Sequence, residues 1–393
     1  MKSTTIEVVS QTLLFLAAGA LFSGPVARAC SWSYTLWSIR TKSADPLFIF
    51  VRSGKAGYID PSGKVVIEAN LPAEDNFFGE FHEGLLAVKE NHGYRYIDPS
   101  GRVAFRTDAW LAFDFSEGLA SASRYAGFPA DKFARWGFID RTGNFAIAPQ
   151  YYGVGSFVGG LARVAVSSEF GTTGYIDKRG RFAIPPHLTY GSGFQEDRAA
   201  VIIGGPCRIT NGGSCGRPTF QPTDKQAAYD CRYAFIDKSG APVSDLRFDD
   251  AMDFSEGLAP VRVGDKWGFV DRAGEMSISP GFKYAGQFSE GLATVAEADG
   301  KMGFIDHSGN FAIPPQFESA GSFSDGRALV TIRENPSRRT YRFIDKNGNP
   351  AFAGEYSDAA PFSHGLAPVA LDRTGSLAWI DTSGRVVLSY TGR

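Results

Sequence analysis

The sequence is dominated by one short pattern that recurs along most of its length. An aromatic residue, then Ile or Val, then Asp and, three positions after the Asp, Gly occur together nine times. The steps between successive copies are 34–42 residues, apart from one step of 60. A unit of this length cannot bury its own apolar face, so we expect consecutive units to stack into one continuous core. The nine aspartates are residues 60, 98, 140, 177, 237, 271, 306, 345 and 381.

Each copy of the pattern predicts two β-strands and the turn that joins them. The aromatic residue and the Asp lie two positions apart, on one side of a strand. The Asp carboxylate is expected to accept a hydrogen bond from the N–H two residues on, and the Gly to take the left-handed conformation that closes the turn. A second element, F-x-x-G-(L/R)-A, reads FSEGLA from both Phe254 and Phe288. We therefore expect three strands per unit: A after the Gly-Leu-Ala, B with the aromatic residue and Asp, and C after the turn.

Two copies carry a further signature before the aromatic residue. They read RWGFID from Arg135 and KWGFVD from Lys266. Together with the F-S-(E/D)-G-L-A element, these segments resemble the WG repeat family, also called KWG repeats, over about residues 46–390. The resemblance implies a β-rich bacterial repeat protein. No set of catalytic residues comes with it, so it implies an architecture and little chemistry.

Nine stacked units can form either an open array or a closed ring. All nine are complete in the sequence, whereas propellers often close by sharing one blade between the two chain ends. Nine blades would also exceed the usual four to eight. We therefore expect an all-β, open, twisted β-solenoid-like array of nine three-stranded units of about 35–40 residues, with a β-propeller as the alternative. The Phe of F-x-x-G is expected to be a core residue that stacks on the Phe of the next unit.

The first 45 residues differ from the repeats. An apolar run at 13–22 is followed by a Gly-Pro pair and by Ala-Arg-Ala at 27–29. This outline predicts a secretory signal peptide over residues 1–29, cleaved between Ala29 and Cys30, and hence an extracytoplasmic protein, periplasmic or secreted. The run is too short for a membrane-spanning helix, which needs about 20 apolar residues. A lipid anchor on Cys30 is the alternative, and residues 30–45 are expected to act as a linker or cap before nine repeats at 46–393.

Differences in repeat length concentrate in the connection between strands A and B. This connection is short in VGDK at 263–266 and longer at 123–135, at 333–340 and in an insertion at 204–232. Equivalent loops lie on one edge of a repeat stack, so the long ones are expected to form a recognition edge. The alternative is that these insertions are merely tolerated. The exposed contacts expected on this edge are Phe128, Lys132, Phe133, Phe220, Arg338 and Arg339.

The insertion at 204–232 contains three of the four cysteines. Cys207 lies at the end of strand A and Cys231 at the start of strand B, so antiparallel pairing predicts a Cys207–Cys231 disulfide, with Cys207–Cys215 as the alternative. An oxidising compartment outside the cytoplasm would favour such a bond. A zinc site is disfavoured, because the spacing fits no common ligand pattern and no His is near.

The rest of the sequence carries little chemistry. A formal net charge of −2 argues against a nucleic acid or an anionic membrane as partner. The five His show no H-E-x-x-H spacing, and no G-x-S-x-G, Walker A or dinucleotide-binding loop occurs, so no cofactor or metal is expected. We predict a non-enzymatic scaffold that binds a protein or glycan through the A–B loop edge. A cell-envelope enzyme acting on wall polymer and a purely structural spacer are the alternatives.

Overall fold

The computed structural model describes residues 46–72, 79–124, 134–167, 172–203, 207–210, 219–222, 231–335, 338–371 and 376–391. Within these residues every regular element is a β-strand. The predicted signal peptide at 1–29 and the predicted cap at 30–45 lie outside the described residues, so both stay predictions.

Each repeat forms strands A and B as predicted, and most repeats form strand C as well. Neighbouring strands pair antiparallel, with Pro260 opposite Phe269 and Phe269 opposite Ile278 in the sixth repeat. The A strands are β1 (Phe48–Arg52), β4 (Leu86–Lys89), β8 (Leu119–Arg124), β12 (Ala162–Ala165), β15 (Ala199–Ile203), β20 (Leu258–Val263), β24 (Leu292–Ala296), β28 (Ala328–Asn335) and β31 (Leu366–Ala370). The B strands are β2 (Lys55–Ile59), β5 (Tyr94–Ile97), β9 (Arg135–Ile139), β13 (Thr173–Ile176), β18 (Tyr233–Ile236), β21 (Lys266–Asp271), β25 (Met302–Ile305), β29 (Arg338–Ile344) and β32 (Ser376–Asp381). The C strands are β3 (Val65–Pro72), β6 (Val103–Thr107), β10 (Phe145–Tyr151), β14 (Phe182–Gly191), β22 (Met276–Phe282), β26 (Phe311–Phe317) and β33 (Val386–Thr391), and isolated bridges replace strand C in the fifth and eighth repeats.

A fourth strand, which we did not predict, precedes strand A in most repeats. The segment before F-x-x-G runs back along strand A, and the two join through a two-residue turn. In the seventh repeat Ser289 pairs with Leu292, and the turn residues Glu290 and Gly291 have φ of 56° and 90°. Positive φ at both positions is the geometry of a tight β-hairpin. These inner strands are β7 (Leu111–Ser116), β11 (Gly153–Val154), β19 (Asp250–Ala251), β23 (Tyr284–Ser289), β27 (Ser319–Ala320) and β30 (Asp358–Ala359).

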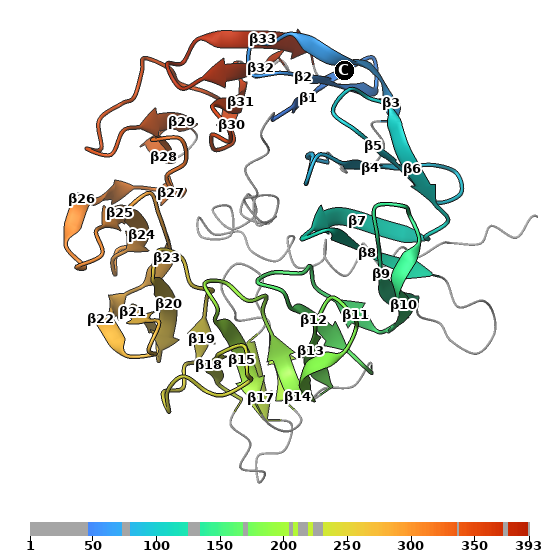
Figure 1. Ribbon diagram of the computed structural model, residues 1–393. Helices are drawn as coiled ribbons and strands as arrows, with labels where there is room; N and C mark the ends of the chain where they lie inside the picture. The colour runs from blue at the N-terminus through green and yellow to red at the C-terminus, as the bar shows by residue number, and fades with distance from the viewer. Residues whose placement is uncertain are drawn as a thin grey trace, which may run out of the picture.

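The sheets follow one another around a closed ring (Figure 1). The described residues form nine sheets; the two-stranded β16 (Cys207–Thr210) and β17 (Thr219–Pro222) belong to the insertion, which leaves eight sheets in the ring. Nine repeats make eight sheets because β14 pairs with both β13 and β15, joining the fourth and fifth repeats into one six-stranded sheet. Where a blade has both strands, the inner strand lies nearest the ring axis and strand C lies outside, as β23 and β26 show in Figure 1. The predicted open solenoid is therefore wrong, and the chain is an eight-bladed β-propeller.

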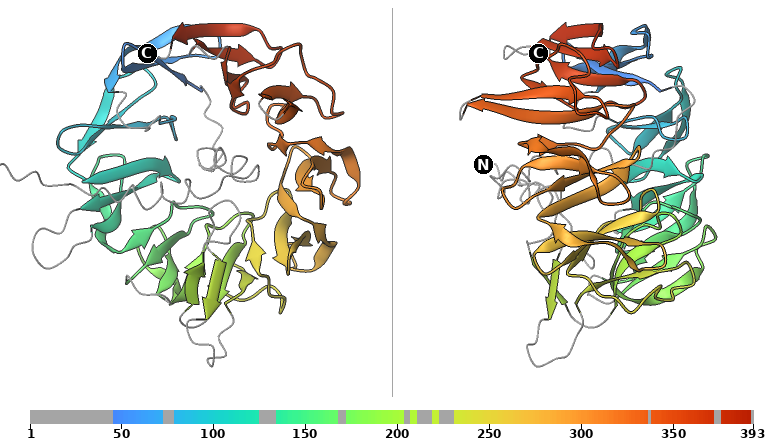
Figure 2. Two further views of the ribbon diagram at one scale, coloured as in Figure 1. Left: turned by 180° about the vertical axis from the view of Figure 1, so that it is seen from behind. Right: turned by 90° about the vertical axis from the view of Figure 1, so that its left-hand side faces the viewer.

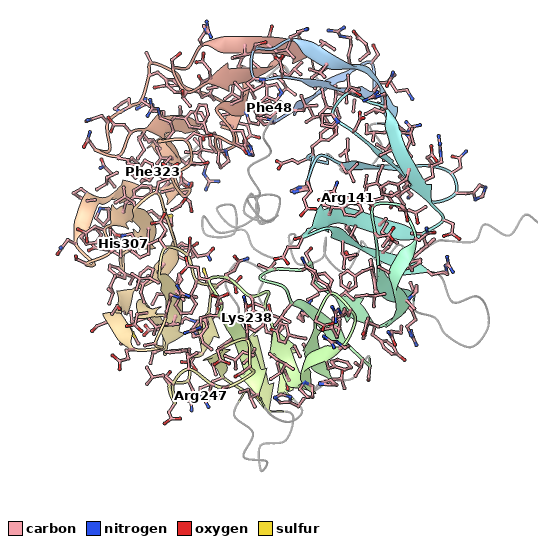
Figure 3. All side chains as sticks on the ribbon, viewed as in Figure 1. Phe48, Arg141, Lys238, Arg247, His307 and Phe323 are labelled. Carbon is pink, nitrogen blue, oxygen red and sulfur yellow. The ribbon has the colours of Figure 1, made fainter. Side chains whose placement is uncertain are left out.

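The ring closes where the last repeat meets the first. The Trp379 indole N–H donates to the Ile49 carbonyl at 2.7 Å, and the Trp379 and Phe48 rings pack at 5.2 Å between centroids. Phe48 therefore lies at the seam (Figure 3). We had taken nine complete repeats as a sign of an open array. The ring nevertheless closes, because the first and last blades pack face to face and share no strand.

The recurring Phe of F-x-x-G is a core residue, as predicted. Its ring packs on the strand B aromatic residue of the preceding repeat, rather than on the next Phe. Phe288 lies 5.1 Å from Phe269, and Phe323 lies 4.9 Å from Phe304 between ring centroids. Burial of an aromatic pair at every blade junction provides the continuous core that no single repeat could form. The buried members of the series are Phe81, Phe115, Phe157, Phe194, Phe254, Phe288, Phe323 and Phe362.

The D-x-x-G turns have the predicted geometry. Asp306 Oδ1 accepts hydrogen bonds from the N–H groups of Ser308 at 2.9 Å and Asn310 at 3.0 Å, and Gly309 has φ of 82°. A Cβ on Gly309 would approach Ile278 of the preceding blade to 3.1 Å, so a glycine lets the turn press on its neighbour. The same contact closes the ring, where a Cβ on Gly63 would lie 2.7 Å from a methyl carbon of Val387.

Candidate functional site

Strand direction divides the connections of the ring between two faces. In the sixth repeat Leu258, beside the F-x-x-G turn, pairs with Asp271, which begins the D-x-x-G turn. At the other end of the same strands Val263 pairs with Lys266 at the A–B connection. The F-x-x-G and D-x-x-G turns therefore share one face, which we name the turn face. The A–B connections lie on the opposite face, which we name the loop face.

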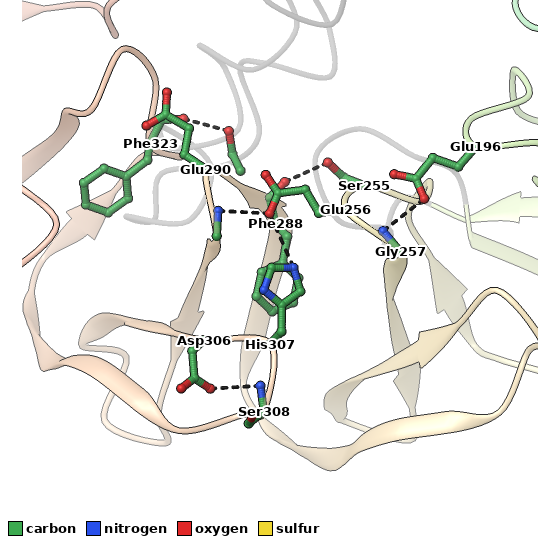
Figure 4. A network of polar contacts seen from close by, with 12 residues as sticks. Glu196, Ser255, Glu256, Gly257, Phe288, Glu290, Asp306, His307, Ser308 and Phe323 are labelled. Atoms are coloured by element: carbon green, nitrogen blue, oxygen red, sulfur yellow. Dashed lines mark hydrogen bonds and ion pairs between the residues drawn. The ribbon is translucent and has the colours of Figure 1, made fainter.

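On the turn face, a carboxylate of one blade binds the backbone of the next. Glu256 Oε2 accepts a hydrogen bond from the Gly291 N–H at 2.9 Å, and Glu196 binds the Gly257 N–H at 3.0 Å in the same way (Figure 4). We name this contact the carboxylate clasp. It occurs at six junctions among the described residues, with donor–acceptor distances of 2.8–3.0 Å. The pairs are Glu83–Gly118, Glu117–Gly160, Glu196–Gly257, Glu256–Gly291, Glu290–Gly326 and Asp325–Gly365.

The serine and the basic residue of the repeat reinforce the clasp. Ser255 Oγ donates to the carbonyl of Phe288 in the next blade at 2.7 Å. The residue that follows the turn Asp is often basic, and its side chain reaches the clasp carboxylate of the preceding blade. Arg141 lies 2.9 Å from Glu83, Lys178 lies 3.1 Å from Glu117, and His307 is placed equivalently on its blade (Figure 3). The serine and glutamate of F-S-E-G and the basic residue after the turn Asp thus connect neighbouring blades.

The clasp accounts for a glutamate in an unfavourable backbone conformation. Clasp residues such as Glu256 have φ near 55°, a region that costs a non-glycine residue about 1 kcal/mol or more. A hydrogen bond to an ionised group contributes about 1.5–3 kcal/mol, which offsets that strain. Since this bond joins separate blades, the strained turn stabilises the ring rather than its own hairpin.

The clasp is missing between the fourth and fifth repeats. Gly159 stands at the glutamate position, and Lys238, which would meet a clasp carboxylate there, pairs with Asp197 of its own blade at 2.5 Å (Figure 3). This is also where β14 pairs with strands of both repeats and joins them into one blade. A continuous sheet therefore replaces the side-chain contact at this seam.

The structure describes only some of the residues predicted for the A–B loop edge, and those that it describes lie on different elements. Phe128, Lys132 and Phe133 lie outside the described residues. Phe220 lies in β17, where only the backbone is described, and it pairs with Ile209 of β16. The insertion thus has a hairpin of its own, which the sequence did not reveal.

The cysteine pairing stays a prediction. Cys207 begins β16, where the backbone alone is described, and lies opposite Pro222. Cys231 is buried just before β18, and Cys215 lies outside the described residues. The backbone register therefore places Cys207 in the hairpin of the insertion rather than opposite strand B.

Arg339 belongs to a cluster of ion-paired side chains on the loop face. The hairpin of β28 and β29 projects beyond its neighbours in the edge-on view (Figure 2). Glu318, just before β27, binds both Arg333 and Arg339, the latter with Nη2 at 2.7 Å and Nε at 3.0 Å from Oε1. Burial opposes ionisation of Glu318, but the hydrogen bonds from the two arginines outweigh it, so its pKa lies below the ordinary value. Arg338, also predicted for this edge, lies in β29 beside them, where its backbone alone is described.

The sequence analysis did not identify an aromatic pair on the third blade, of which Phe113 is exposed and Trp136 is half-buried. Phe113 of β7 stacks on Trp136 with ring centroids 5.6 Å apart, and 38% of Phe113 stays exposed. The repeat has a small residue at the same position in other blades, such as Gly286 and Gly321. An alignment of the repeats on the core Phe would have singled out Phe113 as the departure.

The described residues show no metal centre and no membrane span. Within them, no group of three or more His, Cys, Asp or Glu side chains could hold a metal ion. The same part of the chain has no helix long and apolar enough to cross a bilayer.

The closed ring and its clasps define the protein as a β-propeller built from one repeated unit. Seven segments, which together cover more than half of the chain, match the WG containing repeat family. The chain therefore belongs to the WG containing repeat family, as its sequence motifs indicated. The matched residues are 57–93, 136–167, 174–205, 233–267, 267–301, 302–335 and 341–373.

Solved structures resemble the chain at low sequence identity, and no curated protein matches it. Apo AztD from Citrobacter koseri is 12% identical, over 88% of this chain and 94% of that one, with a TM-score of 0.41. BamB from Moraxella catarrhalis is 13% identical, over 72% and 92%, with a TM-score of 0.38. The C-terminal WD40 domain of Sif2 is 11% identical, over 76% and 78%, with a TM-score of 0.34. At these scores the similarity says nothing about function.

Proposed function

We propose that this protein is a non-enzymatic binding scaffold that acts outside the cytoplasm and recognises a protein or glycan partner through its loop face. The proposal rests on the difference between the two faces: the turn face is constant from blade to blade, and the loop face varies. The turn face repeats one geometry from blade to blade, and its carboxylates, serines and basic residues make contacts between blades. The loop face carries the variation in length and the projecting β28–β29 hairpin. Variable loops on a rigid scaffold are the usual place for recognition.

The extracytoplasmic location rests on the sequence of residues 1–29. A secretory leader is consistent with cysteines confined to residue 30 and the insertion, since disulfides persist in oxidising compartments. The non-enzymatic assignment rests on the sequence motifs. No G-x-S-x-G and no H-E-x-x-H spacing occurs in the sequence, so none of these hydrolytic motifs supports an enzyme.

Exchange of the loop face tests this proposal. In the test variant, the connections at 123–135, 204–232 and 333–340 are replaced by the short VGDK type of the sixth repeat. Arg179→Ser, an exposed change on the turn face, is the matched control. Partners captured from envelope extract are crosslinked to the protein and the crosslinks are mapped. We expect loss of partners in the loop variant only, with crosslinks on the loop face. Retention of the same partners by a folded loop variant would leave the protein a spacer.

A further inference from the structure

Resting on the proposed function, we propose that the β28–β29 hairpin is a docking site for an acidic segment of a partner protein, contacted by the guanidinium groups of Arg333 and Arg339. The hairpin is long, with eight residues in β28 and seven in β29, and it stands out from the loop face. A segment lying along it would meet both side chains, because Arg333 and Arg339 are directly opposite each other in the strand register.

The Glu318 carboxylate holds the two guanidinium groups in place. Glu318 contacts both with a side chain that is only 12% exposed, while Arg333 and Arg339 remain 43% and 32% exposed. Both arginines bind the same oxygen, Oε1. A planar guanidinium fork fixed in this way loses little conformational entropy when it binds a second carboxylate, so the pair is preorganised for ligands that carry carboxylates.

The charge of this hairpin is not balanced within it. Residues 331–342 contain four arginines and one glutamate, a formal charge of +3, whereas the equivalent residues 296–303 of the seventh repeat have two acids and one lysine, a charge of −1. Glu318 and Glu355, which contact the hairpin arginines, reduce the +3 to +1. In a chain of net charge −2, this is a local positive projection that would attract an acidic partner.

The small number of arginines favours protein carboxylates over a polyanion. Proteins that hold nucleic acid neutralise many phosphates along an extended basic surface, and about 6–10 contacts are typical of tight complexes. The described part of this hairpin offers two preorganised guanidinium groups on one narrow projection. Two such forks match a pair of carboxylates on a short peptide segment.

Binding of labelled poly-L-glutamate to the full chain, measured by fluorescence anisotropy, tests the inference. The Arg333→Gln/Arg339→Gln variant is compared with Arg181→Gln, which alters an exposed arginine on the turn face that pairs with Asp177 at 2.7 Å. We expect the double variant to bind about tenfold more weakly and the control to bind like wild type, with affinity falling as salt rises. Circular dichroism and melting curves establish that each variant is folded.

Three outcomes would overturn the inference. They are an absence of wild-type binding, equal binding by the double variant, and binding of heparin in place of poly-L-glutamate, which would point to a sulfated glycan. The proposed function has its own readout in the loop-exchange experiment. Loop exchange could remove the partners while the double variant binds poly-L-glutamate as tightly as wild type. In that case the partner binds another part of the loop face, and this inference fails while the proposed function stands.

Discussion

Removal of one carboxylate clasp should loosen a single seam of the ring in a measurable way. Glu256→Ala deletes the acceptor of the Gly291 N–H, at 2.9 Å, and the partner of His307, at 3.4 Å. A hydrogen bond to an ionised group contributes about 1.5–3 kcal/mol. Because 34% of the Glu256 side chain is exposed, water replaces part of that interaction, so we expect a loss of about 1–2 kcal/mol. The backbone strain stays the same, since alanine at this position keeps the positive φ.

Glu256→Gln separates the hydrogen bond from the charge. The amide oxygen can still accept from Gly291, but a neutral bond is about half as strong, so the loss should be about half that of Glu256→Ala. Glu275→Ala, which alters an exposed glutamate of the same blade, is the control and should change stability little.

Two measurements check the prediction. In calorimetry, Glu256→Ala should lower Tm by about 2–5 °C, using the sensitivity of large domains to 1 kcal/mol. In native-state hydrogen exchange, the Gly291 amide should lose protection while amides of distant blades keep theirs. Unchanged protection at Gly291, or equal effects of the alanine and glutamine variants, would refute the idea that a charged clasp holds the seam.

Three further perturbations follow from the same structure. Gly159→Glu should place the missing clasp carboxylate beside Lys238, since other clasp glutamates tolerate the same positive φ. We expect the free energy of unfolding to rise by up to about 1 kcal/mol, with a higher Tm. A lower Tm would show that this junction has no room for the side chain. Trp379→Phe removes the N–H bond to Ile49 and part of a buried ring, and should cost about 2–3 kcal/mol in urea unfolding, whereas a negligible change would mean that the closing seam contributes little. Acid should destabilise the ring, because hydrogen bonds from neighbouring side chains and backbone groups hold the pKa of seven turn aspartates, Asp60 among them, below the ordinary value. A carboxyl with a lowered folded-state pKa stabilises above its unfolded pKa and loses that contribution as pH falls through the folded value, so the unfolding free energy should fall below about pH 4; constant stability down to pH 3 would contradict this.

Local rules predicted the turns and the core well. The Asp and Gly of D-x-x-G act within a few residues, so their hydrogen bonds and positive φ could be read from the sequence alone. Burial of the recurring Phe followed from its spacing. Its partner could not be read, because the partner lies in the preceding blade.

Two features of the fold were beyond local rules. Ring closure depends on a small rotation between neighbouring repeats that accumulates around the ring, and no single repeat encodes its sum. The inner strand was missed because its turn is Glu-Gly in several repeats, such as Glu256-Gly257 and Glu290-Gly291, whereas tight hairpins are usually signalled by Asn-Gly or Asp-Gly. Glutamate is accepted there because Glu256 and its equivalents bind the next blade, which is a non-local reason.

The candidate site was predictable only in outline. The spacing of the repeats indicated which connections vary, and it led to Arg339, which lies beside the partly buried carboxylate of Glu318. The sequence could not show that Glu318 and Arg333 meet Arg339, because Glu318 precedes β27 whereas the two arginines lie in β28 and β29. Phe113 was missed because we compared the repeats only at the positions that recur in every copy, and Phe113 lies outside them.

The seam between the first and last blades has a consequence for the gene that encodes such a ring. Gly63 presses on Val387 just as each later turn glycine presses on the blade before it. No strand is exchanged at this seam, so it is held by the same kind of contact as the other junctions. Circularly permuted genes, opened at any A–B connection, should encode the same ring.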